Sequence, residues 1–312
     1  MNIVIPDDYQ NCVTTLDCYQ KLAGHSVTIY NDTAHNLDDL VARFKDADAI
    51  VLTRERTRIT DELLSRLPRL KLISQTGKVA NHIDMEACKK HGVTVLEGSG
   101  SGAATAELGM LLILSSLRHF TEEVERMRNG QWQGLVGRQL QGRTLGVLGF
   151  GRIGEQICRI GQAFGAKPLV WGRASSVAKA AGKGFAVASS REAFFSTCDV
   201  ISVQLRLGAE TKNYVTAADL ALMKSDAIFV NTSRAELVEE GALYNALKLG
   251  HPGFAAVDVY EEEPLMDGLR HPLQDLPNCL CSPHIGFVER DNYEAYYGTA
   301  FDNINTFFNI HS

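Results

Sequence analysis

Three segments in the second half of the chain carry ionisable side chains directly after short apolar runs. They contain Arg234, Glu263 and His284, with Asp258 at the start of the second segment. A guanidinium can hold a planar carboxylate and polarise the carbonyl beside it. An imidazole can supply a proton to a developing alkoxide, and a nearby carboxylate can orient that imidazole. Together these residue types suit the reduction of a ketone, although each alone would also suit a surface arginine, an acidic run or a core histidine.

A glycine-rich turn precedes these segments. Residues 144–154 read TLGVLGFGRIG, which places Gly149, Gly151 and Gly154 at the spacing of a dinucleotide-binding turn. We expect Gly149 to make the tight turn, Gly151 to let the backbone approach a pyrophosphate, and Gly154 to allow close packing of helix on strand. The helix that follows should bury Ile153, Ile157, Ile160 and Phe164, which recur at helical spacing.

The choice of cofactor depends on the end of the next strand, Leu169–Trp171. An acid there would accept hydrogen bonds from the adenosine ribose, but the chain has Gly172 followed by Arg173. Arg173 next to this position favours a 2′-phosphate, and therefore NADP over NAD. A solvent-facing loop arginine is the alternative interpretation.

The elements that must position these residues alternate between strand and helix. Strands are predicted at 2–5, 26–30, 49–52, 71–74 and 93–96, and then at 144–150, 169–171, 199–205, 227–231, 254–259 and 279–282; helices are predicted at 10–23, 36–45, 60–67, 84–91 and 104–128, with a helical tail from Glu289. Short buried strands alternating with helices predict an α/β fold with parallel sheets. We expect a substrate-binding domain of residues 1–100 and 286–312, and a dinucleotide-binding Rossmann domain of residues 101–285.

Composition narrows the class of protein further. The chain has 312 residues and a net charge of −6, which argues against nucleic-acid or anionic membrane partners. The longest apolar stretch, residues 108–117, is too short to span a membrane, and the first residues do not read as a secretory signal. Seven scattered cysteines predict neither a disulfide framework nor a metal site, and Cys279 and Cys281 should point to one face of a strand as small buried side chains. A cytoplasmic enzyme is expected.

Four ordered pieces between residues 70 and 290 resemble the D-isomer-specific 2-hydroxyacid dehydrogenase family, which includes glyoxylate/hydroxypyruvate reductases and phosphoglycerate dehydrogenases. They are LQGRTLGVLGFGRIG (140–154), NTSRAELVEEGAL (231–243), AVDVYEEEPL (256–265) and SPHIG (282–286). The resemblance implies that Arg234 binds and polarises the substrate, that His284 is the acid/base with Glu263 as its partner, and that Asp258 holds the nicotinamide carboxamide. It also implies a flavodoxin-like substrate domain and a homodimer formed through the hinge helix near 104–128.

The resemblance extends to the residues around both ligands. For the cofactor it implies contacts with the three glycines, Arg173 and Asp258. It also implies contacts with Thr105, Arg152, Ile153, Leu205, Arg206, Thr211, Thr232, Ser233 and Gly286. For the substrate it implies Arg54 and the loop Gly77-Lys78-Val79, together with Arg234 and His284. The chain departs from the family pattern at Lys78, Val79, Gln204, Arg206, Ala235 and Phe287, which leaves the substrate open.

The sequence therefore predicts an NAD(P)-dependent oxidoreductase that interconverts a small 2-keto acid and its D-2-hydroxy acid. Phosphoglycerate oxidation for serine synthesis is one alternative. A non-enzymatic regulatory scaffold that senses NAD(P) is another, although an intact Arg234, Glu263 and His284 argue against it. Formate oxidation is disfavoured, because formate dehydrogenases of this family carry glutamine where this chain has Glu263.

Overall fold

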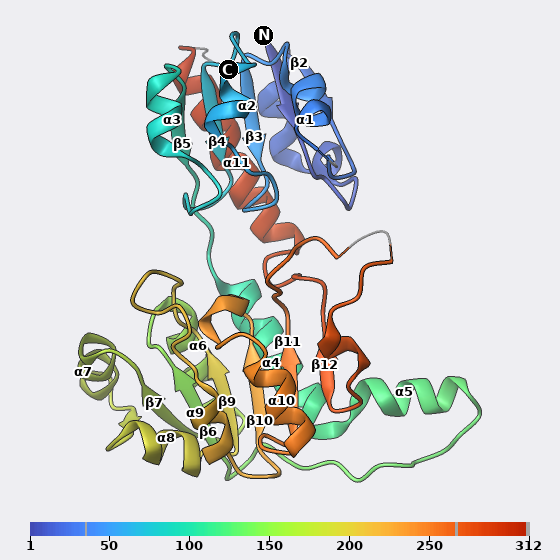
Figure 1. The fold of residues 1–312 in the computed structure, drawn as a ribbon, viewed down its shortest axis with the longest axis vertical. Coiled ribbons are helices and arrows are strands. Elements are labelled where there is room, and N and C mark those ends of the chain that lie inside the picture. The colour runs from blue at the N-terminus through green and yellow to red at the C-terminus, as the bar shows by residue number, and fades with distance from the viewer. Residues whose placement is uncertain (35, 266–267, 310–312) are drawn as a thin grey trace. The chain divides into compact units, whose positions relative to one another are not determined.

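The computed structural model describes residues 1–34, 36–265 and 268–309, and the chain divides into two compact units (Figure 1). The first unit contains Met1–Ser101 and Val288–Ser312, and the second contains Gly102–Phe287. The last three residues of the predicted first domain lie outside the described ranges.

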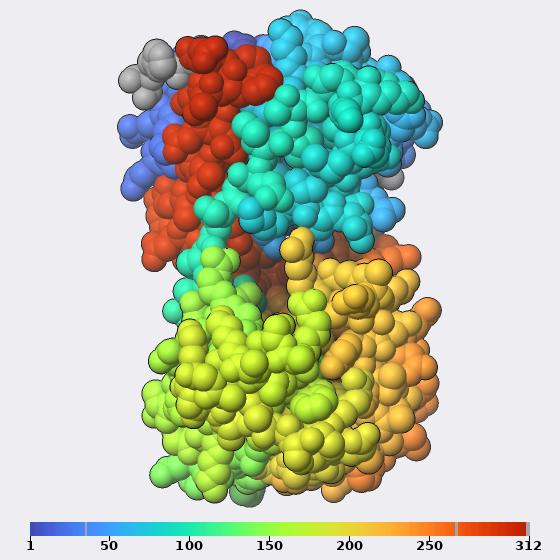
Figure 2. Space-filling view, turned by 90° about the vertical axis from the view of Figure 1, so that its left-hand side faces the viewer, coloured from blue at the N-terminus to red at the C-terminus, as the bar shows by residue number. Residues whose placement is uncertain are grey.

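The first unit is a five-stranded parallel sheet in the order β2-β1-β3-β4-β5, the order of a flavodoxin-like fold. Its strands are β1 (Asn2–Ile5), β2 (Ser26–Ile29), β3 (Ala49–Leu52), β4 (Leu72–Gln75) and β5 (Thr94–Glu97), and its helices are α1 (Leu37–Phe44), α2 (Asp61–Ser65), α3 (Met85–Lys90) and the C-terminal α11 (Arg290–Phe307). Ser74 Oγ donates to the Ala300 carbonyl at 2.9 Å, and α11 lies beside β4 and β5 (Figure 1). In the space-filling view, the red C-terminal helix adjoins the teal segment around β5 (Figure 2).

One prediction for this unit is wrong, because a segment predicted as an α-helix forms 3₁₀ helices. Residues 10–23 form two short 3₁₀ helices, Val13–Thr15 and Asp17–Leu22, instead of one α-helix. Leu16 between them is extended, at φ −79° and ψ 140°, so the α-helical ladder cannot run through it. The Asp8 carboxylate accepts hydrogen bonds from the Cys12 and Val13 N–H groups and fixes the start of the segment.

The second unit is a seven-stranded parallel sheet in the order β12-β11-β10-β9-β6-β7-β8, which is the doubly wound Rossmann order extended by one strand. Its strands are β6 (Thr144–Leu148), β7 (Lys167–Trp171), β8 (Ala186–Val187), β9 (Val200–Val203), β10 (Ile228–Asn231), β11 (Phe254–Val257) and β12 (Cys279–Cys281). Its helices are α4 (Ala103–Arg118), α5 (Phe120–Arg128), α6 (Arg152–Ala163), α7 (Ala174–Gly182), α8 (Arg191–Thr197), α9 (Ala217–Leu222) and α10 (Ala242–Leu249). The α/β prediction is confirmed, although the two-residue β8 was not predicted.

Both faces of this second sheet are covered by helices. Strand residues that alternate along the chain pack into two apolar clusters, one against α4, α6 and α7 and the other against α8, α9 and α10. Val147 and Val230 belong to the first cluster, whereas Leu148 and Phe229 belong to the second. Residues that alternate along a strand point to opposite faces, which explains the nearly continuous apolar runs in the sequence.

Two expectations about helices of the second unit need correction. The predicted helix 104–128 is broken at His119, whose φ of 49° is left-handed, so α4 and α5 are separate helices. The predicted buried face of α6 includes Phe164, but Phe164 lies just past the last helical turn and is 48% exposed. Gly154, Cys158 and Gly161 are buried on α6 beside Ile157 instead.

Among the described residues, no helix is long and apolar enough to cross a membrane. No group of three or more His, Cys, Asp or Glu side chains in the described part of the chain is arranged to hold a metal ion. All seven cysteines carry free thiols, and four of them are buried.

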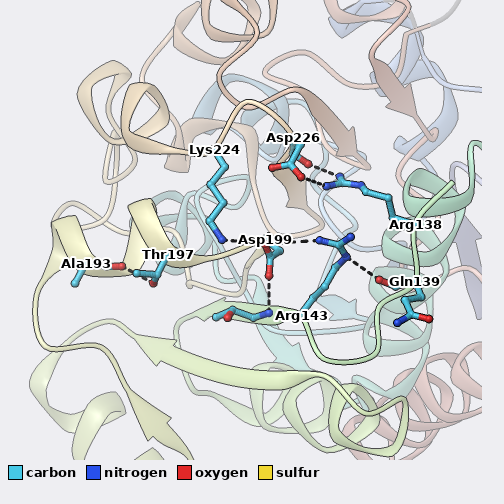
Figure 3. A network of polar contacts seen from close by, with 9 residues as sticks. Arg138, Gln139, Arg143, Ala193, Thr197, Asp199, Lys224 and Asp226 are labelled. Carbon is cyan, nitrogen blue, oxygen red and sulfur yellow. Dashed lines mark hydrogen bonds and ion pairs between the residues drawn. The ribbon is translucent and has the colours of Figure 1, made fainter. Parts of the chain in front are cut away.

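A network of charges centred on Asp199 ties the amino ends of β6 and β9 together (Figure 3). The Asp199 carboxylate accepts hydrogen bonds from the Thr144 N–H and from Lys224 Nζ at 2.8 and 2.9 Å, and Arg143 lies 3.9 Å away. Burial alone would raise the pKa of Asp199, but Lys224, the Thr144 N–H and Arg143 outweigh burial and lower it below its ordinary 3.8. Nearby, Arg138 pairs with the more exposed Asp226.

We predict that Asp199→Asn lowers the free energy of unfolding at pH 7 by about 1–3 kcal/mol, because Lys224 and Arg143 lose their counter-charge. A carboxylate with a lowered pKa stabilises the fold above its unfolded-state pKa and loses that effect as pH falls. The difference between variant and wild type should therefore shrink below the ordinary pKa of 3.8. Both tryptophans, Trp132 and Trp171, belong to the second unit, so their fluorescence during urea unfolding reports on it.

The matched control is Asp226→Asn, because the Asp226 side chain is 59% exposed and its ion pair should contribute less than about 1 kcal/mol. Equal losses in both variants, or an Asp199→Asn effect that does not change with pH, would contradict this account of the network.

Candidate active site

The turn between β6 and α6 depends on its three glycines. Gly149 has a left-handed φ of 97°, and a Cβ there would lie 2.6 Å from the Gln204 carbonyl oxygen. A Cβ on Gly154 would lie 2.3 Å from the Gly149 carbonyl oxygen, so the helix packs directly on the turn. A Cβ on Gly151 would meet no atom within 4 Å, which leaves open space above the backbone.

The first turn of α6 fits a phosphate-bearing ligand. No side chain caps this end of the helix, and Arg152 and Ile153 are its first two residues. The N–H groups of a first helical turn have no partner within the helix, and together with the helix dipole they favour an anion. The open space at Gly151 would let a diphosphate approach these donors.

The neighbouring turn after β7 carries the residues predicted to contact the adenosine ribose. A Cβ on Gly172 would lie 3.4 Å from the Gly149 backbone, so the two turns are in contact. Arg173 precedes the first residue of α7 and is exposed, and its carbonyl accepts the Ser176 N–H at 2.8 Å. The structure therefore places an exposed guanidinium one residue from the glycine turn.

Two further loops lie at the same edge of the sheet. Leu205 is buried beside Gly149, and Thr211 Oγ1 donates to the Arg206 carbonyl at 2.7 Å and thereby closes the loop after β9. Thr232, directly after β10, accepts a hydrogen bond from Gln204 Nε2 at 3.0 Å. Gln204, a departure from the family pattern, thus bonds the ends of β9 and β10 to each other.

Arg234 is held in place by its own loop. The Asn231 side chain accepts the Ser233 N–H at 3.0 Å and donates to the Arg234 carbonyl at 2.9 Å. Ser233 Oγ donates to the Val203 carbonyl at 2.9 Å, and Arg234 Nη1 donates to the Ser233 carbonyl at 2.6 Å. Sequence reasoning did not single out Asn231, whose signal is an asparagine that ends a buried strand three residues before the arginine.

Asp258 holds the turn that carries His284. Its carboxylate is fully buried and accepts hydrogen bonds from Ser282 Oγ at 2.6 Å, the Ile285 N–H at 2.9 Å and the Gly286 N–H at 2.8 Å. Burial raises the pKa of Asp258, and these donors oppose that rise. Thr105 Oγ1 of α4 donates to the Gly286 carbonyl at 2.9 Å, which secures the turn from the other side.

His284 and Glu263 are in direct contact, in line with the pairing that the family resemblance implies. His284 Nδ1 and Glu263 Oε2 form a short hydrogen bond, and Glu263 Oε1 accepts the Tyr260 N–H at 2.8 Å. His284 has a left-handed φ of 50°, and its ring packs edge-on against Phe287 at 5.5 Å. Because Glu263 engages Nδ1, Nε2 is the ring nitrogen available to a substrate.

Strand order brings these groups to one edge of the sheet. β10, β11 and β12 are neighbours, and Arg234, Asp258 and His284 each follow the carboxyl end of one of them. Ligands of open parallel sheets bind outside these carboxyl ends. The edge therefore combines a guanidinium, an imidazole–carboxylate pair and an uncapped helix end.

Four of the predicted substrate residues, Arg54, Gly77, Lys78 and Val79, belong to the first unit, whereas Arg234 and His284 belong to the second. Arg54 has a left-handed φ of 54°, and its backbone carbonyl accepts a hydrogen bond from Gln75 Nε2 at 2.7 Å. Its guanidinium covers Gly77, because a Cβ added to Gly77 would lie 1.9 Å from Arg54 Nη1. Glu97, which sequence reasoning missed, accepts hydrogen bonds from Lys78 Nζ at 2.6 Å and the Val79 N–H at 2.7 Å. The substrate-binding role of these residues stays a prediction.

Comparisons with known proteins identify the class and then the family. The family described as "D-isomer specific 2-hydroxyacid dehydrogenase, NAD binding domain" matches residues 110–286. Glyoxylate reductase of Aeropyrum pernix is 34% identical over 282 residues, which are 86% of this chain and 82% of that protein. Hydroxypyruvate reductase of Thermotoga maritima is 32% identical over 252 residues, covering 80% and 81% of the two chains.

Two further similar proteins have names that refer to phosphoglycerate. A solved structure of phosphoglycerate oxidoreductase from Vibrio cholerae is 49% identical, with a TM-score of 0.96 and complete coverage of both chains. D-3-phosphoglycerate dehydrogenase of Methanocaldococcus jannaschii is 34% identical over 261 residues, which are 83% of this chain but only 49% of that protein.

The chain is thus an oxidoreductase that uses a nicotinamide dinucleotide. It belongs to the D-isomer specific 2-hydroxyacid dehydrogenase family, whose relatives named above are reductases and dehydrogenases of small keto and hydroxy acids. The predicted family, Rossmann domain and enzymatic activity are confirmed, and the non-enzymatic alternative is not supported.

We predict that Asp258→Asn lowers turnover about 10- to 100-fold. The amide nitrogen cannot accept a hydrogen bond, so the Ile285 or Gly286 N–H is left without an acceptor at a cost of about 1–3 kcal/mol, and the His284 turn loosens. Steady-state kinetics and hydrogen exchange of residues 282–287 measure both effects. Asp275→Asn, at an exposed ion pair with Arg270, is the matched control. Wild-type turnover and exchange in Asp258→Asn would contradict the role of Asp258 in holding the turn.

Proposed function

We propose that the chain reduces the C2 carbonyl of a small 2-keto acid such as glyoxylate or hydroxypyruvate, with His284 as the proton donor. The contact between His284 and Glu263 on the turn held by Asp258 is the observation that carries this proposal. When bound, the reduced nicotinamide supplies the hydride that attacks C2. The names of the Aeropyrum pernix and Thermotoga maritima relatives support these substrates.

Three residues of the second unit have separate roles in the reaction at C2 of the substrate. His284 Nε2 donates a proton to the carbonyl oxygen as negative charge develops there. Glu263 on Nδ1 orients the ring and balances the positive charge of the imidazolium. Arg234, whose backbone is fixed by Asn231, binds the substrate carboxylate through its guanidinium and polarises the carbonyl.

The loop Gly77-Lys78-Val79 of the first unit is proposed to bind the acid group of the substrate, with Arg54 as a second cation. Glu97 engages Lys78 and the Val79 N–H, so a substrate carboxylate has to compete with Glu97 for these donors. The Arg54 guanidinium lies over Gly77, and its central carbon is 5.5 Å from the centre of the Tyr296 ring. A cation therefore lies beside the loop.

Oxidation of 3-phosphoglycerate is the second candidate function. The name of the Vibrio cholerae relative, at 49% identity, favours it. A screen of glyoxylate, hydroxypyruvate, pyruvate and 3-phosphoglycerate with both forms of the cofactor separates the candidates by the ratio of their kcat/KM values.

We also propose that NADP is preferred over NAD. Gly172 stands where an acid would hold the ribose hydroxyls and repel a 2′-phosphate, so neither effect operates. Arg173 is exposed beside it and Ser175 and Ser176 follow, which supplies a guanidinium and hydroxyls to a phosphate.

A homodimer formed through the region of α4 and α5 is proposed from its exposed apolar side chains. Trp132 is 75% exposed and Val136 is 93% exposed in the segment after α5, and Phe120 and Met127 on α5 are exposed as well. Apolar side chains gathered in this way mark a protein–protein contact, which the molar mass in solution tests. The seven free thiols favour a reducing compartment, and we place the enzyme in the cytoplasm.

We predict that His284→Ala lowers kcat about 10²- to 10⁴-fold and that Arg234→Ala lowers kcat/KM by about 10²-fold or more. Cofactor affinity, measured by fluorescence titration, should stay near that of the wild type, because neither residue lies in the glycine turn. His91→Ala, at a surface pair with Asp61, is the matched control. If either active-site variant retained more than about a tenth of the wild-type rate, its assigned role would be wrong.

We predict that Arg173→Ala raises the KM for NADPH by about tenfold and leaves the KM for NADH unchanged. A charge-assisted hydrogen bond to phosphate stabilises by about 1.5–3 kcal/mol, which solvent reduces at an exposed site. Lys167→Ala, at the opposite end of β7, is the control for loss of a positive charge. A wild-type preference for NADH, or an unchanged KM for NADPH in Arg173→Ala, would contradict the proposed NADP preference.

A further inference from the structure

Two thiols face each other on the strand that leads to His284. β12 is the three-residue strand Cys279–Cys281 at the edge of the second sheet, and within the described part of the chain it pairs with β11 alone. Both side chains point to the same face, and the two Sγ atoms are 3.8 Å apart. Both residues are half-buried, in contrast to the fully buried Cys158 and Cys198. The predicted burial of this pair is therefore only partial.

The surroundings distinguish the two thiols from each other. The Cys279 thiol, hydrogen-bonded to Cys281, lowers the pKa of Cys281 below its ordinary 9.0, while burial opposes this effect. The same hydrogen bond, together with burial, raises the pKa of Cys279. A thiolate is the reactive form of cysteine, so Cys281 is the nucleophile of the pair.

The backbone of this strand continues directly into the catalytic turn. Ser282 follows Cys281, and its N–H donates to the Val257 carbonyl at 2.9 Å, its hydroxyl donates to Asp258 at 2.6 Å and its carbonyl accepts from the Tyr260 hydroxyl at 2.9 Å. His284 is two residues further on. A change in the pleat of β12 therefore moves a residue that Asp258 uses to hold the turn.

A bond between the two thiols would require such a change. A disulfide has an S–S distance of about 2.05 Å and Cβ atoms about 3.5–4.5 Å apart. Alternate residues of an extended strand lie about 6.6 Å apart at Cα, at the upper limit for a disulfide. The strand has to shorten to close the bond, and an edge strand paired on one side only offers little resistance.

We propose that Cys279 and Cys281 form an oxidation site at which hydrogen peroxide oxidises the two thiols to an intrastrand disulfide, and that this disulfide displaces the His284 turn. The Cys281 thiolate attacks the peroxide oxygen, the O–O bond breaks, and one water leaves as a sulfenic acid forms on Cys281. The Cys279 sulfur then attacks Cys281 Sγ and expels the second water. Two thiols lose two electrons and two protons in total, and the peroxide becomes two waters. A dithiol reductant reverses the reaction by exchange.

Tryptic digestion gives a direct readout of this site. Residues 271–290 form one tryptic peptide that contains both Cys279 and Cys281 and no other cysteine. After brief treatment of the full chain with hydrogen peroxide and alkylation of the remaining thiols, this peptide should lack both alkyl groups and have lost two hydrogen atoms. Hydrogen exchange of residues 282–287 should rise, kcat should fall by at least about tenfold, and dithiothreitol should restore both.

Variants separate this site from the other five cysteines. Cys279→Ser and Cys281→Ser should keep their basal activity and retain it after peroxide treatment, whereas Cys12→Ser, the control at a half-buried thiol in the first unit, should respond like the wild type. Two alkylated cysteines in peptide 271–290 after peroxide treatment would overturn the proposal. So would a disulfide that changes neither exchange nor turnover.

The effect on turnover rests on the proposed function, but the chemistry does not. If the disulfide forms and exchange rises while no 2-keto acid is reduced, the oxidation site stands and the proposed function fails. If the wild type reduces 2-keto acids and its cysteines stay reduced in peroxide, only the oxidation site fails.

Discussion

The Asp258 carboxylate is buried at the carboxyl end of β11 and accepts hydrogen bonds from Ser282 and from the Ile285 and Gly286 N–H groups. A buried charge is tolerated only where hydrogen bonds replace water, so these three donors are a condition of the fold. They bend the chain after β12 and set the left-handed backbone of His284. The His284 imidazole is therefore positioned by a residue that lies 26 positions earlier in the sequence.

Other polar side chains along this edge of the sheet also hold loops through hydrogen bonds to the backbone. Asn231 bonds the loop that carries Arg234, and Glu263 bonds the Tyr260 N–H with one oxygen while the other meets His284. In each case a polar side chain near the end of a parallel strand satisfies backbone groups that the sheet no longer pairs. Loop geometry is thus fixed by short polar side chains, while the apolar strands between them provide the rigid frame.

Much of this fold follows from sequence periodicity, because strands buried on both faces read as continuous apolar runs and the glycines of residues 149–154 mark one specific turn. The left-handed break at His119 and the extended Leu16 escaped prediction, since local backbone conformation at non-glycine residues leaves little trace in residue type. Arg234, Glu263 and His284 could be named from chemistry and family resemblance. The contacts of Asp258, Asn231 and Glu97 could not, because they depend on the register of separate strands and loops.

Direct hydride transfer to the C2 carbonyl of a 2-keto acid is the reaction proposed for this site. The most direct test uses reduced cofactor deuterated at C4 of the nicotinamide, with hydroxypyruvate as the acceptor, followed by analysis of the product by mass spectrometry and chiral chromatography. We predict a D-configured 2-hydroxy acid that carries the deuterium at C2. An L-configured or racemic product, or a product whose C2 hydrogen comes from solvent, would contradict it.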